Sequence, residues 1–136
     1  LIIMSLWGVG NATLIYLAGL QDVPVSLYES ADLDGAQSWH KTVYITIPMI
    51  TPTILFNVVM GLINAFQYFT QAYIMTNGGP ADSTLFYSLY LYNNSFRYFK
   101  MGYASAQAWL LFVIIMFFTL LLLRSARHWV FYAGED

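Results

Sequence analysis

The sequence predicts an all-α, polytopic membrane protein, because it is rich in apolar residues, poor in charge, and leaves long runs without any charge. Of its 136 residues, 59% are hydrophobic and 9% are charged, whereas a soluble domain carries about 25% charged residues. No charged residue lies in 1–21, 42–81 or 101–123. A helix of about 20 residues crosses the apolar core of a bilayer. We therefore expect about three membrane-spanning helices.

The same composition excludes several classes of protein. A net charge of −2 without a basic stripe argues against binding to nucleic acid. The absence of cysteine excludes a disulfide framework and a thiolate metal site. His40 and His128 are isolated near the two expected cytoplasmic segments, which indicates interfacial anchors rather than metal ligands. We expect no catalytic residue and no metal site in this chain.

The first expected span covers residues 1–21. Its glycines, among them Gly19, allow neighbouring helices to approach closely. Asn11 should face protein or water rather than lipid. The chain begins with Leu1 and lacks the charged start of a signal peptide. We therefore expect residues 1–136 to be one transmembrane domain, and a fragment that begins inside a span.

The polar connection 22–47 predicts two short helices joined by a turn. Ser26 and Glu29 form a capping-box pattern that should start a helix running to about Leu33. Asp34-Gly35 is a turn signal, since glycine adopts a positive φ without a Cβ clash. A second short helix should run from Ala36 towards residue 47.

The second span is expected over 48–76, where Pro48 and Pro52 lie at the helix start and their missing N–H groups cost least. It should end at the turn 76–80. The tyrosine-rich segment 77–100 is typical of a short helix at the membrane–water interface.

The third span is expected over 101–123. Its first half is made of small residues and should pack on other helices, whereas its bulky second half could face lipid. Arg124 and Arg127 follow at once, so the positive-inside rule places the tail 124–136 in the cytoplasm. The connection 22–47 is then inside as well, and 77–100 is outside.

A stripe in the second span recurs at spacings of four and three, which puts its residues within about 80° of arc on one helix: Asn57, Gly61, Asn64, Tyr68 and Gln71. Gln67 lies at the edge of this stripe. Amides that face hydrocarbon are costly, so this face must meet protein or a water-filled cavity. Amide and tyrosine groups both donate and accept hydrogen bonds, as sugar hydroxyls require. Bonds between helices are the alternative role. The candidate substrate-pathway residues are Asn57, Asn64, Gln67, Tyr68 and Gln71.

The polar connection also carries a longer motif: Glu29-Ser30-Ala31, then Asp34-Gly35-Ala36, then Ile47-Pro48. With this spacing it resembles the cytoplasmic EAA loop of inner-membrane permease subunits of binding-protein-dependent ABC transporters. The turn 76–80 and the segment 102–106 are similar to the carbohydrate-uptake branch. The likeness covers essentially the whole chain as the C-terminal part of one subunit.

The resemblance implies a mechanical role without chemistry of its own. The elbow of the EAA loop would dock on a cytoplasmic ATPase dimer that binds the ATP, and ATPase closure would move the spans. A second permease subunit, an extracytoplasmic solute-binding protein and a sugar would be the other partners, in the inner membrane of a prokaryote. The residues implied in ATPase coupling are Glu29, Ser30, Ala31, Asp34, Gly35, Ala36 and Pro48.

Two other functions are weighed against this one. A catalytic subunit of another membrane complex would need His, Asp or Glu within the spans, and the three uncharged runs contain none. A purely structural subunit predicts that changes between Asn64 and Gln71 alter assembly but never substrate choice. The second span also lacks a cation for a phosphorylated substrate, which favours a neutral sugar.

Overall fold

The computed structural model describes residues 1–5 and 8–131, and this part of the chain is made of helices and turns without a strand. It divides into two compact units. We call the unit of Ile2–Val58 with the residues from Arg124 onwards the elbow part, and the unit of Val59–Leu123 the hairpin part.

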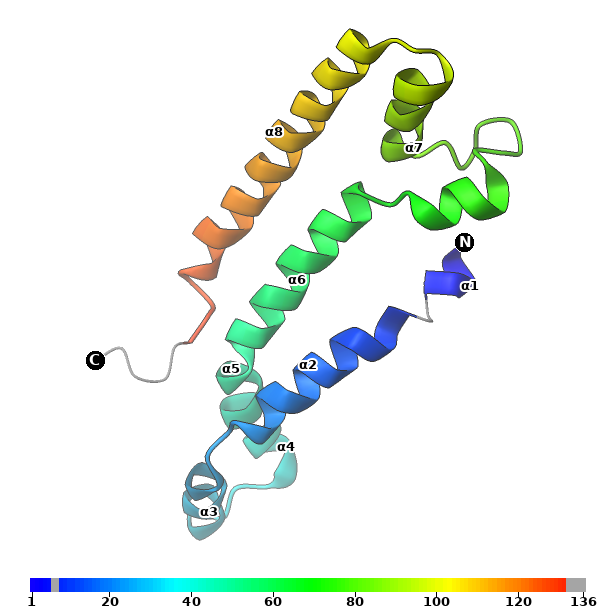
Figure 1. The fold of residues 1–136 in the computed structure, drawn as a ribbon. Coiled ribbons are helices and arrows are strands. Elements are labelled where there is room, and N and C mark those ends of the chain that lie inside the picture. Colours follow the sequence, from blue (N-terminus) through cyan, green and yellow to red (C-terminus); the bar gives the residue numbers. More distant parts are fainter. Residues whose placement is uncertain (6–7, 132–136) are drawn as a thin grey trace. The chain divides into compact units, whose positions relative to one another are not determined.

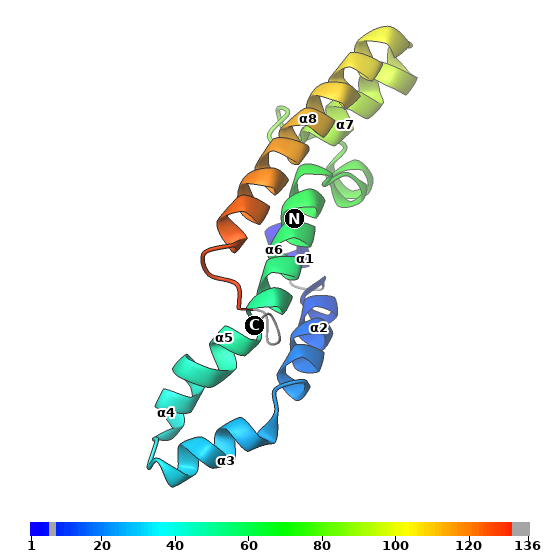
Figure 2. The ribbon, with the colours of Figure 1, turned by 90° about the vertical axis from the view of Figure 1, so that its left-hand side faces the viewer.

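The elbow part contains a series of helices joined by short turns. They are α1 (Ile2–Ser5), α2 (Val9–Gln21), α3 (Val25–Leu33), α4 (Ser38–Lys41), a π-helical segment (Thr42–Thr46), α5 (Ile47–Met49) and the start of α6 (Thr51–Phe66). Because α4, the π-helical segment and α5 follow without a break, they form one helical arm. Figures 1 and 2 show α3 and this arm diverging from a tight turn.

The arm and α6 meet at a bend of 60°. Pro52 has no N–H to donate to the carbonyl of Pro48, four residues earlier, and its ring disfavours a straight helix there. The Thr51 hydroxyl donates to that carbonyl instead, at 2.6 Å, and accepts a bond from the backbone N–H of Phe131 at 2.9 Å. Thr51 is buried. The Pro48 carbonyl freed at the bend is therefore hydrogen-bonded, and Thr51 also links the bend to Phe131, the last described residue.

Glycine permits a close approach between α2 and the start of α6. A Cβ atom at Gly19 would lie 2.5 Å from the Oγ1 atom of Thr53. Real Cβ atoms essentially never approach so closely, so a side chain here would require the Thr53 side chain or the two helices to shift. The small residue that the sequence predicts at a helix–helix contact is confirmed at this position.

The hairpin part contains the rest of α6, a π-helical turn (Ala72–Thr76), α7 (Tyr87–Tyr92), a π-helical extension of α7 (Asn93–Arg97) and most of α8 (Met101–Ala126). Figures 1 and 2 both show α7 beside the first turns of α8. The Tyr87 hydroxyl donates to the backbone carbonyl of Gln107 at 3.0 Å. The amide of Asn94 donates to the side-chain carbonyl of Gln107 at 3.4 Å.

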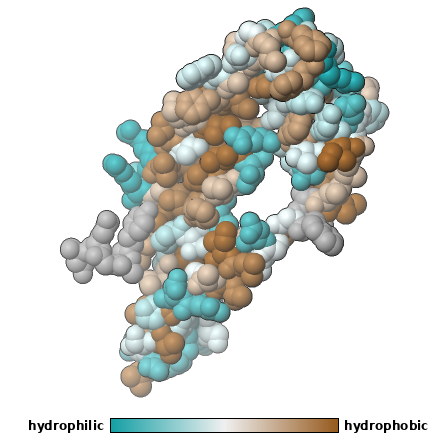
Figure 3. Space-filling view, viewed as in Figure 1, coloured by the Kyte–Doolittle hydropathy of each residue, from teal (hydrophilic) through white to brown (hydrophobic). Residues whose placement is uncertain are grey.

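The two halves of α8 have different surroundings. In the first half Ala104 and Gln107 are buried. Ala104 is the single small residue of this half that the described chain covers, since Gly102, Ser105, Ala106 and Ala108 are exposed, and the expected packing is therefore found at that position alone. In the second half large apolar side chains such as Phe117 and Leu120 are exposed. Figure 3 shows apolar atoms along α8, and such a surface suits contact with lipid or with another span.

Two helical stretches are long and apolar enough to cross a membrane: Ile2–Gln21, which includes the two residues left undescribed, and Met101–Ala126. A third span is obtained if the bent pair Ser38–Met49 and Thr51–Phe66 counts as one. The expected all-α fold with about three spans is confirmed at this level. The last helix extends three residues beyond the expected end at 123.

Two expected details are wrong. The capping box does not form: α3 begins at Val25 after an extended Pro24, which precedes Ser26 and fixes the start, and no side chain caps this helix. The second span is not one helix over 48–76, because α6 ends at Phe66 and helical structure resumes only at Thr70. The Ser88 hydroxyl donates to the Phe66 carbonyl at 3.1 Å, so a residue from another element satisfies the end of α6.

Candidate functional site

The elbow between α3 and α4 is built on a glycine turn. Gly35 has a φ of +75°, a backbone conformation that L-residues with a side chain rarely adopt. Its N–H donates to the Asp32 carbonyl at 3.0 Å, and the N–H of Ala36 donates to the Ala31 carbonyl at 2.9 Å. These two bonds form a Schellman motif, which ends α3 at Leu33. The predicted turn at Asp34-Gly35 is confirmed.

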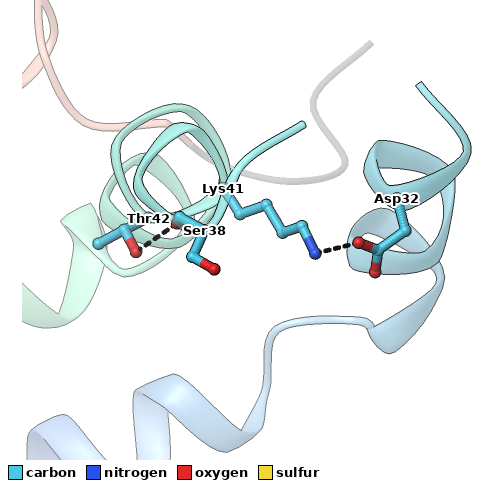
Figure 4. Close-up of polar contacts among 4 residues, drawn as sticks. All are labelled: Asp32, Ser38, Lys41 and Thr42. Atoms are coloured by element: carbon cyan, nitrogen blue, oxygen red, sulfur yellow. Dashed lines mark hydrogen bonds and ion pairs between the residues drawn. The ribbon is translucent and has the colours of Figure 1, made fainter. Parts of the chain in front are cut away.

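Two side-chain contacts brace the elbow from within. The Lys41 ammonium forms an ion pair with the carboxylate of Asp32, across the turn between α4 and α3 (Figure 4). The hydroxyls of Tyr28 and Thr46 are hydrogen-bonded at 2.7 Å. One contact lies near the turn and the other farther along both arms. Together with the turn they hold α3 at a defined angle to the arm.

Figure 4 also shows a side-chain hydrogen bond within the first turn of the arm. The Thr42 hydroxyl donates to the carbonyl of Ser38 at 3.0 Å, which occupies a carbonyl of the first helical turn. Gln37 precedes it in extended conformation. The second helix therefore begins at Ser38, two residues after the expected Ala36, because the residues after Gly35 are used to complete the turn.

The predicted coupling residues fall into two places. Glu29, Ser30 and Asp34 are exposed on α3 and its end, Ala31 and Ala36 are half-buried at the turn, and Gly35 makes the turn. Pro48 lies at the opposite end of the arm, beside the bend. Six of the seven residues therefore lie together on α3 and the turn that follows it. The seventh, Pro48, lies near the bend between the arm and α6.

The elbow also exposes apolar side chains that the sequence analysis did not single out. Leu33 is 90% exposed at the end of α3, and Trp39 is 62% exposed on α4. Exposed large apolar groups beside an exposed carboxylate such as Glu29 are typical of a protein contact surface. The sequence analysis also did not predict the two bracing pairs. Asp32 and Lys41, for example, are nine residues apart and become neighbours only through the turn.

The substrate-pathway candidates do not form one helical stripe. Asn64 is exposed on α6, Gln67 and Tyr68 lie in the break after it, and Gln71 lies in the next helical piece. Asn57 belongs to the elbow part, where its amide donates to the Thr53 carbonyl at 3.0 Å. The 3.6-residue periodicity therefore does not relate Tyr68 and Gln71 to Asn64.

The break sends Gln67 and Tyr68 to different surroundings. Gln67 lines a hollow of about 420 Å³ beside α8. The ring of Tyr68 meets that of Phe86 edge to face, with centroids 5.0 Å apart. Apart from Gln67 and Thr119 the hollow is apolar; its lining is Ile63, Gln67, Ala108, Leu111, Phe112, Ile115, Met116, Thr119 and Leu120.

An aromatic cluster lies just beyond the break. The rings of Phe69, Tyr73, Tyr92 and Phe96 form a chain of contacts with centroids 5.1 to 5.4 Å apart. Tyr73 raises the pKa of Tyr92 above its ordinary value, first through a side-chain hydrogen bond and then through repulsion between the two phenolates. Such rings offer flat apolar faces with hydroxyls at their edges. The high density of tyrosine in 77–100 was the feature of the sequence that pointed to the part of this cluster on α7 and its extension.

The sequence comparisons agree with this architecture. The profile of the family described as "binding-protein-dependent transport system inner membrane component" matches residues 1–130. The chain belongs to this family. It is thus an ABC transporter permease chain, as the resemblance of its elbow motif predicted, and such a chain is a transport component and not an enzyme.

Three curated relatives are similar over most of the chain. A probable ABC transporter permease protein, YesP of Bacillus subtilis, is 48% identical over all of the chain and 45% of its own length. The lactose transport system permease protein LacF of Rhizobium radiobacter is 38% identical over 88% of the chain and 41% of its own length. The arabinooligosaccharides transport system permease protein AraP of Bacillus subtilis is 33% identical over 91% and 40%.

The chain therefore spans less than half the length of these relatives. Two of them are named for the transport of sugars. The family of inner-membrane transport components is therefore shown for this chain, and sugar transport is stated in the names of two relatives.

Proposed function

We propose that this chain belongs to the membrane-spanning subunit of a prokaryotic ABC importer, lines the translocation pathway for a neutral sugar, and is driven by a separate ATPase through residues 28–47. The observation on which the coupling role rests is the braced elbow, whose turn is rigid while its outer residues stay exposed. ATP binding and hydrolysis would occur on a cytoplasmic ATPase dimer.

The elbow suits the transmission of force. Its two arms are fixed to each other by the Asp32–Lys41 ion pair and the Tyr28–Thr46 bond. The arm leads without a break to Met49, and α6 begins beyond the bend at Thr51. A displacement applied at α3 would therefore reach α6 through a short helix rather than through a flexible loop. Glu29 would meet a basic group of the ATPase, and Leu33 an apolar pocket beside it.

The chemistry of the hairpin part supports a neutral sugar as substrate. Asn64 and Gln71 are exposed amides, and Tyr68 offers both a hydroxyl and a ring. These groups donate and accept hydrogen bonds without carrying charge. No charged side chain lies between residues 42 and 81, so a phosphate group would find no cation there. Asn57 and Gln67 are proposed as secondary members of the pathway.

The proposed topology follows from charge. Arg124 and Arg127, at and just beyond the end of the last span, support a cytoplasmic C-terminus and a cytoplasmic elbow. A second permease subunit would complete the pathway. An extracytoplasmic solute-binding protein would deliver the sugar to the side of segment 77–100.

Disulfide cross-linking in the full-length subunit tests the coupling role. Leu33→Cys, on a cysteine-free background, is co-expressed with the ATPase carrying single cysteines along its cleft. Ser83→Cys, in the exposed part of segment 77–100, is the matched control. We expect a cross-link from position 33 that changes with ATP, and none from position 83.

Two results would overturn the coupling role. One is the absence of a cross-link from a folded, membrane-inserted Leu33→Cys protein whose thiol reacts with a cytoplasmic reagent. The other is equal cross-linking from positions 33 and 83, which would indicate random collision.

A further inference from the structure

A short exposed segment, Phe96–Lys100, connects the π-helical extension of α7 to α8. We call it the aromatic–basic turn. Phe96, Tyr98 and Phe99 are 58%, 59% and 80% exposed. Arg97 and Lys100, the two cations between them, are exposed as well. Five consecutive exposed residues of only these two chemical kinds are unusual, since large exposed apolar groups mark contact sites.

The aromatic–basic turn is ordered by what lies beneath it. Asn93 and Asn94, which precede it, are buried. The N–H of Tyr98 donates to the Asn93 carbonyl at 2.9 Å, and the N–H of Lys100 donates to the Asn94 carbonyl at 2.8 Å. These bonds fix both ends of the turn to a buried base. The exposed rings are therefore displayed at defined positions.

The backbone of the aromatic–basic turn is strained at its most exposed residue. Phe99 has a φ of +53°, a left-handed conformation that residues with a Cβ atom rarely adopt. Its ring is 80% exposed, so burial within the described chain does not offset this strain. Strain at an exposed aromatic residue points to a contact made outside the chain.

The charges of the aromatic–basic turn also lack an acidic partner. Among the described residues neither Arg97 nor Lys100 forms an ion pair, and the sequence contains no Asp or Glu from 83 to 134. Both cations lie on the side that the positive-inside rule leaves poor in positive charge. The anions that would balance them must come from another molecule.

The position of the aromatic–basic turn indicates which kind of molecule supplies the anions for Arg97 and Lys100. It ends at Lys100, and α8, a helix apolar enough to cross a membrane, begins at Met101. The start of a span lies at the level of the lipid headgroups, where aromatic rings are enriched and phosphate groups are the available anions. A cation at this level is attracted to the negative charge of anionic lipid headgroups.

We propose that the aromatic–basic turn is an interfacial anchor: Arg97 and Lys100 bind the phosphate groups of anionic phospholipids, while Phe96, Tyr98 and Phe99 insert beside them into the headgroup layer. The anchor fixes the start of α8 at one depth in the bilayer. It goes beyond the proposed sugar transport and does not depend on it, because it requires only that α8 spans the membrane.

Spin labelling of the full-length transporter in nanodiscs tests the anchor. A nitroxide is attached through Phe96→Cys, which leaves both cations and the turn at Phe99 unchanged, and through Ser83→Cys as the control. We expect position 96 to be accessible to oxygen and shielded from a water-soluble nickel chelate, and position 83 to show the reverse. The solute-binding protein is then added as a second condition.

Titration with phosphatidylglycerol in phosphatidylcholine nanodiscs tests the role of the cations. The motion of the nitroxide at position 96 should become restricted as the anionic lipid increases. Arg97→Gln and Lys100→Gln should each raise the fraction of phosphatidylglycerol needed for half the effect about fivefold, the equivalent of about 1 kcal/mol per cation.

Three results would overturn the anchor. If position 96 is open to the nickel chelate in the transporter alone and shielded only after the solute-binding protein is added, the turn binds an acidic protein surface. If it is open in both conditions, the turn has no partner of either kind. If it is shielded but insensitive to phosphatidylglycerol and to both substitutions, the rings insert without recognition of phosphate.

Discussion

Two interruptions of helical structure, the turn at Gly35 and the break after Phe66, are made in opposite ways. At Gly35 the chain turns through bonds between Ala31, Asp32 and the two residues after Asp34, all within six positions. At Phe66 the freed carbonyl is satisfied by Ser88, 22 residues away. A helix end formed by its own neighbours can be predicted from local sequence, whereas one formed by a distant side chain cannot.

Substitution of Gly35 should have the largest effect, since it removes the conformation on which the local turn depends. Gly35→Val places a β-branched residue at a φ of +75°, which such residues essentially never adopt. We expect ATP-dependent sugar uptake by the full-length transporter to fall more than tenfold, with the subunit still inserted.

Two comparisons sharpen this prediction. Gly35→Asn should retain most uptake, because Asn tolerates the left-handed region. Gly61→Ala is the matched control: Gly61 lies inside α6 with open space around it, so this change should be neutral or slightly stabilising. Normal uptake by Gly35→Val would show that the elbow angle does not matter.

Loss of the distant bond at the break should come next. Ser88→Ala leaves the part-buried Phe66 carbonyl without its partner, and the cost of an unsatisfied group reaches about 1–3 kcal/mol where water cannot replace that partner. We expect a lower midpoint of thermal unfolding for the purified subunit in detergent. Ser105→Ala removes only an exposed bond to the Met101 carbonyl of its own helix and should leave the midpoint unchanged. Equal midpoints for the two variants would mean that Ser88 does not determine the break.

Removal of the Tyr68 hydroxyl should have a smaller effect, and it should change the affinity for substrate rather than the stability of the fold. Tyr68→Phe keeps the ring contact with Phe86 and removes one neutral hydrogen bond, a change of about 0.5–1.5 kcal/mol. We expect the KM for uptake to rise two- to tenfold while thermal stability is retained. Tyr44→Phe, an exposed tyrosine of the arm, should leave KM unchanged. An unchanged KM for Tyr68→Phe would remove this residue from the proposed pathway.

The ion pair of the elbow should have the smallest effect on stability. The Asp32 side chain is 63% exposed, so solvent screens the pair, and exposed pairs contribute roughly 0.2–1 kcal/mol. A double-mutant cycle with Asp32→Asn and Lys41→Gln, measured by thermal unfolding at low and high salt, should give a coupling energy in this range that falls as salt rises. A coupling energy independent of salt would show that the two charges do not interact directly.

The elbow was largely predictable because its signals are local. Gly35 predicted the turn, and the motif spacing from Glu29 to Pro48 indicated the family to which the chain belongs. The capping box at Ser26 was wrong for a local reason too: Pro24 is the N-cap, so the helix starts two residues earlier than a cap at Ser26 would allow. The roles of Glu29 and its neighbours in coupling remain predictions.

The pathway residues were less predictable because their arrangement depends on contacts between elements. The polar periodicity from Asn57 to Gln71 assumed one continuous helix, and Phe66 ends it. The result is that Gln67 lines the hollow beside α8 while Tyr68 meets Phe86. No feature of the residues at 66–69 alone distinguishes these two outcomes.

By itself the sequence determined the apolar runs that form the spans, the charges that separate them and the glycine turn of the elbow, because hydrophobicity and backbone conformation are properties of each residue and its neighbours. Only the tertiary structure decided the 60° bend at Thr51, the break satisfied by Ser88 and the pairing of Asp32 with Lys41. Each of these depends on which polar group a side chain finds across space, and that choice is made when the helices pack.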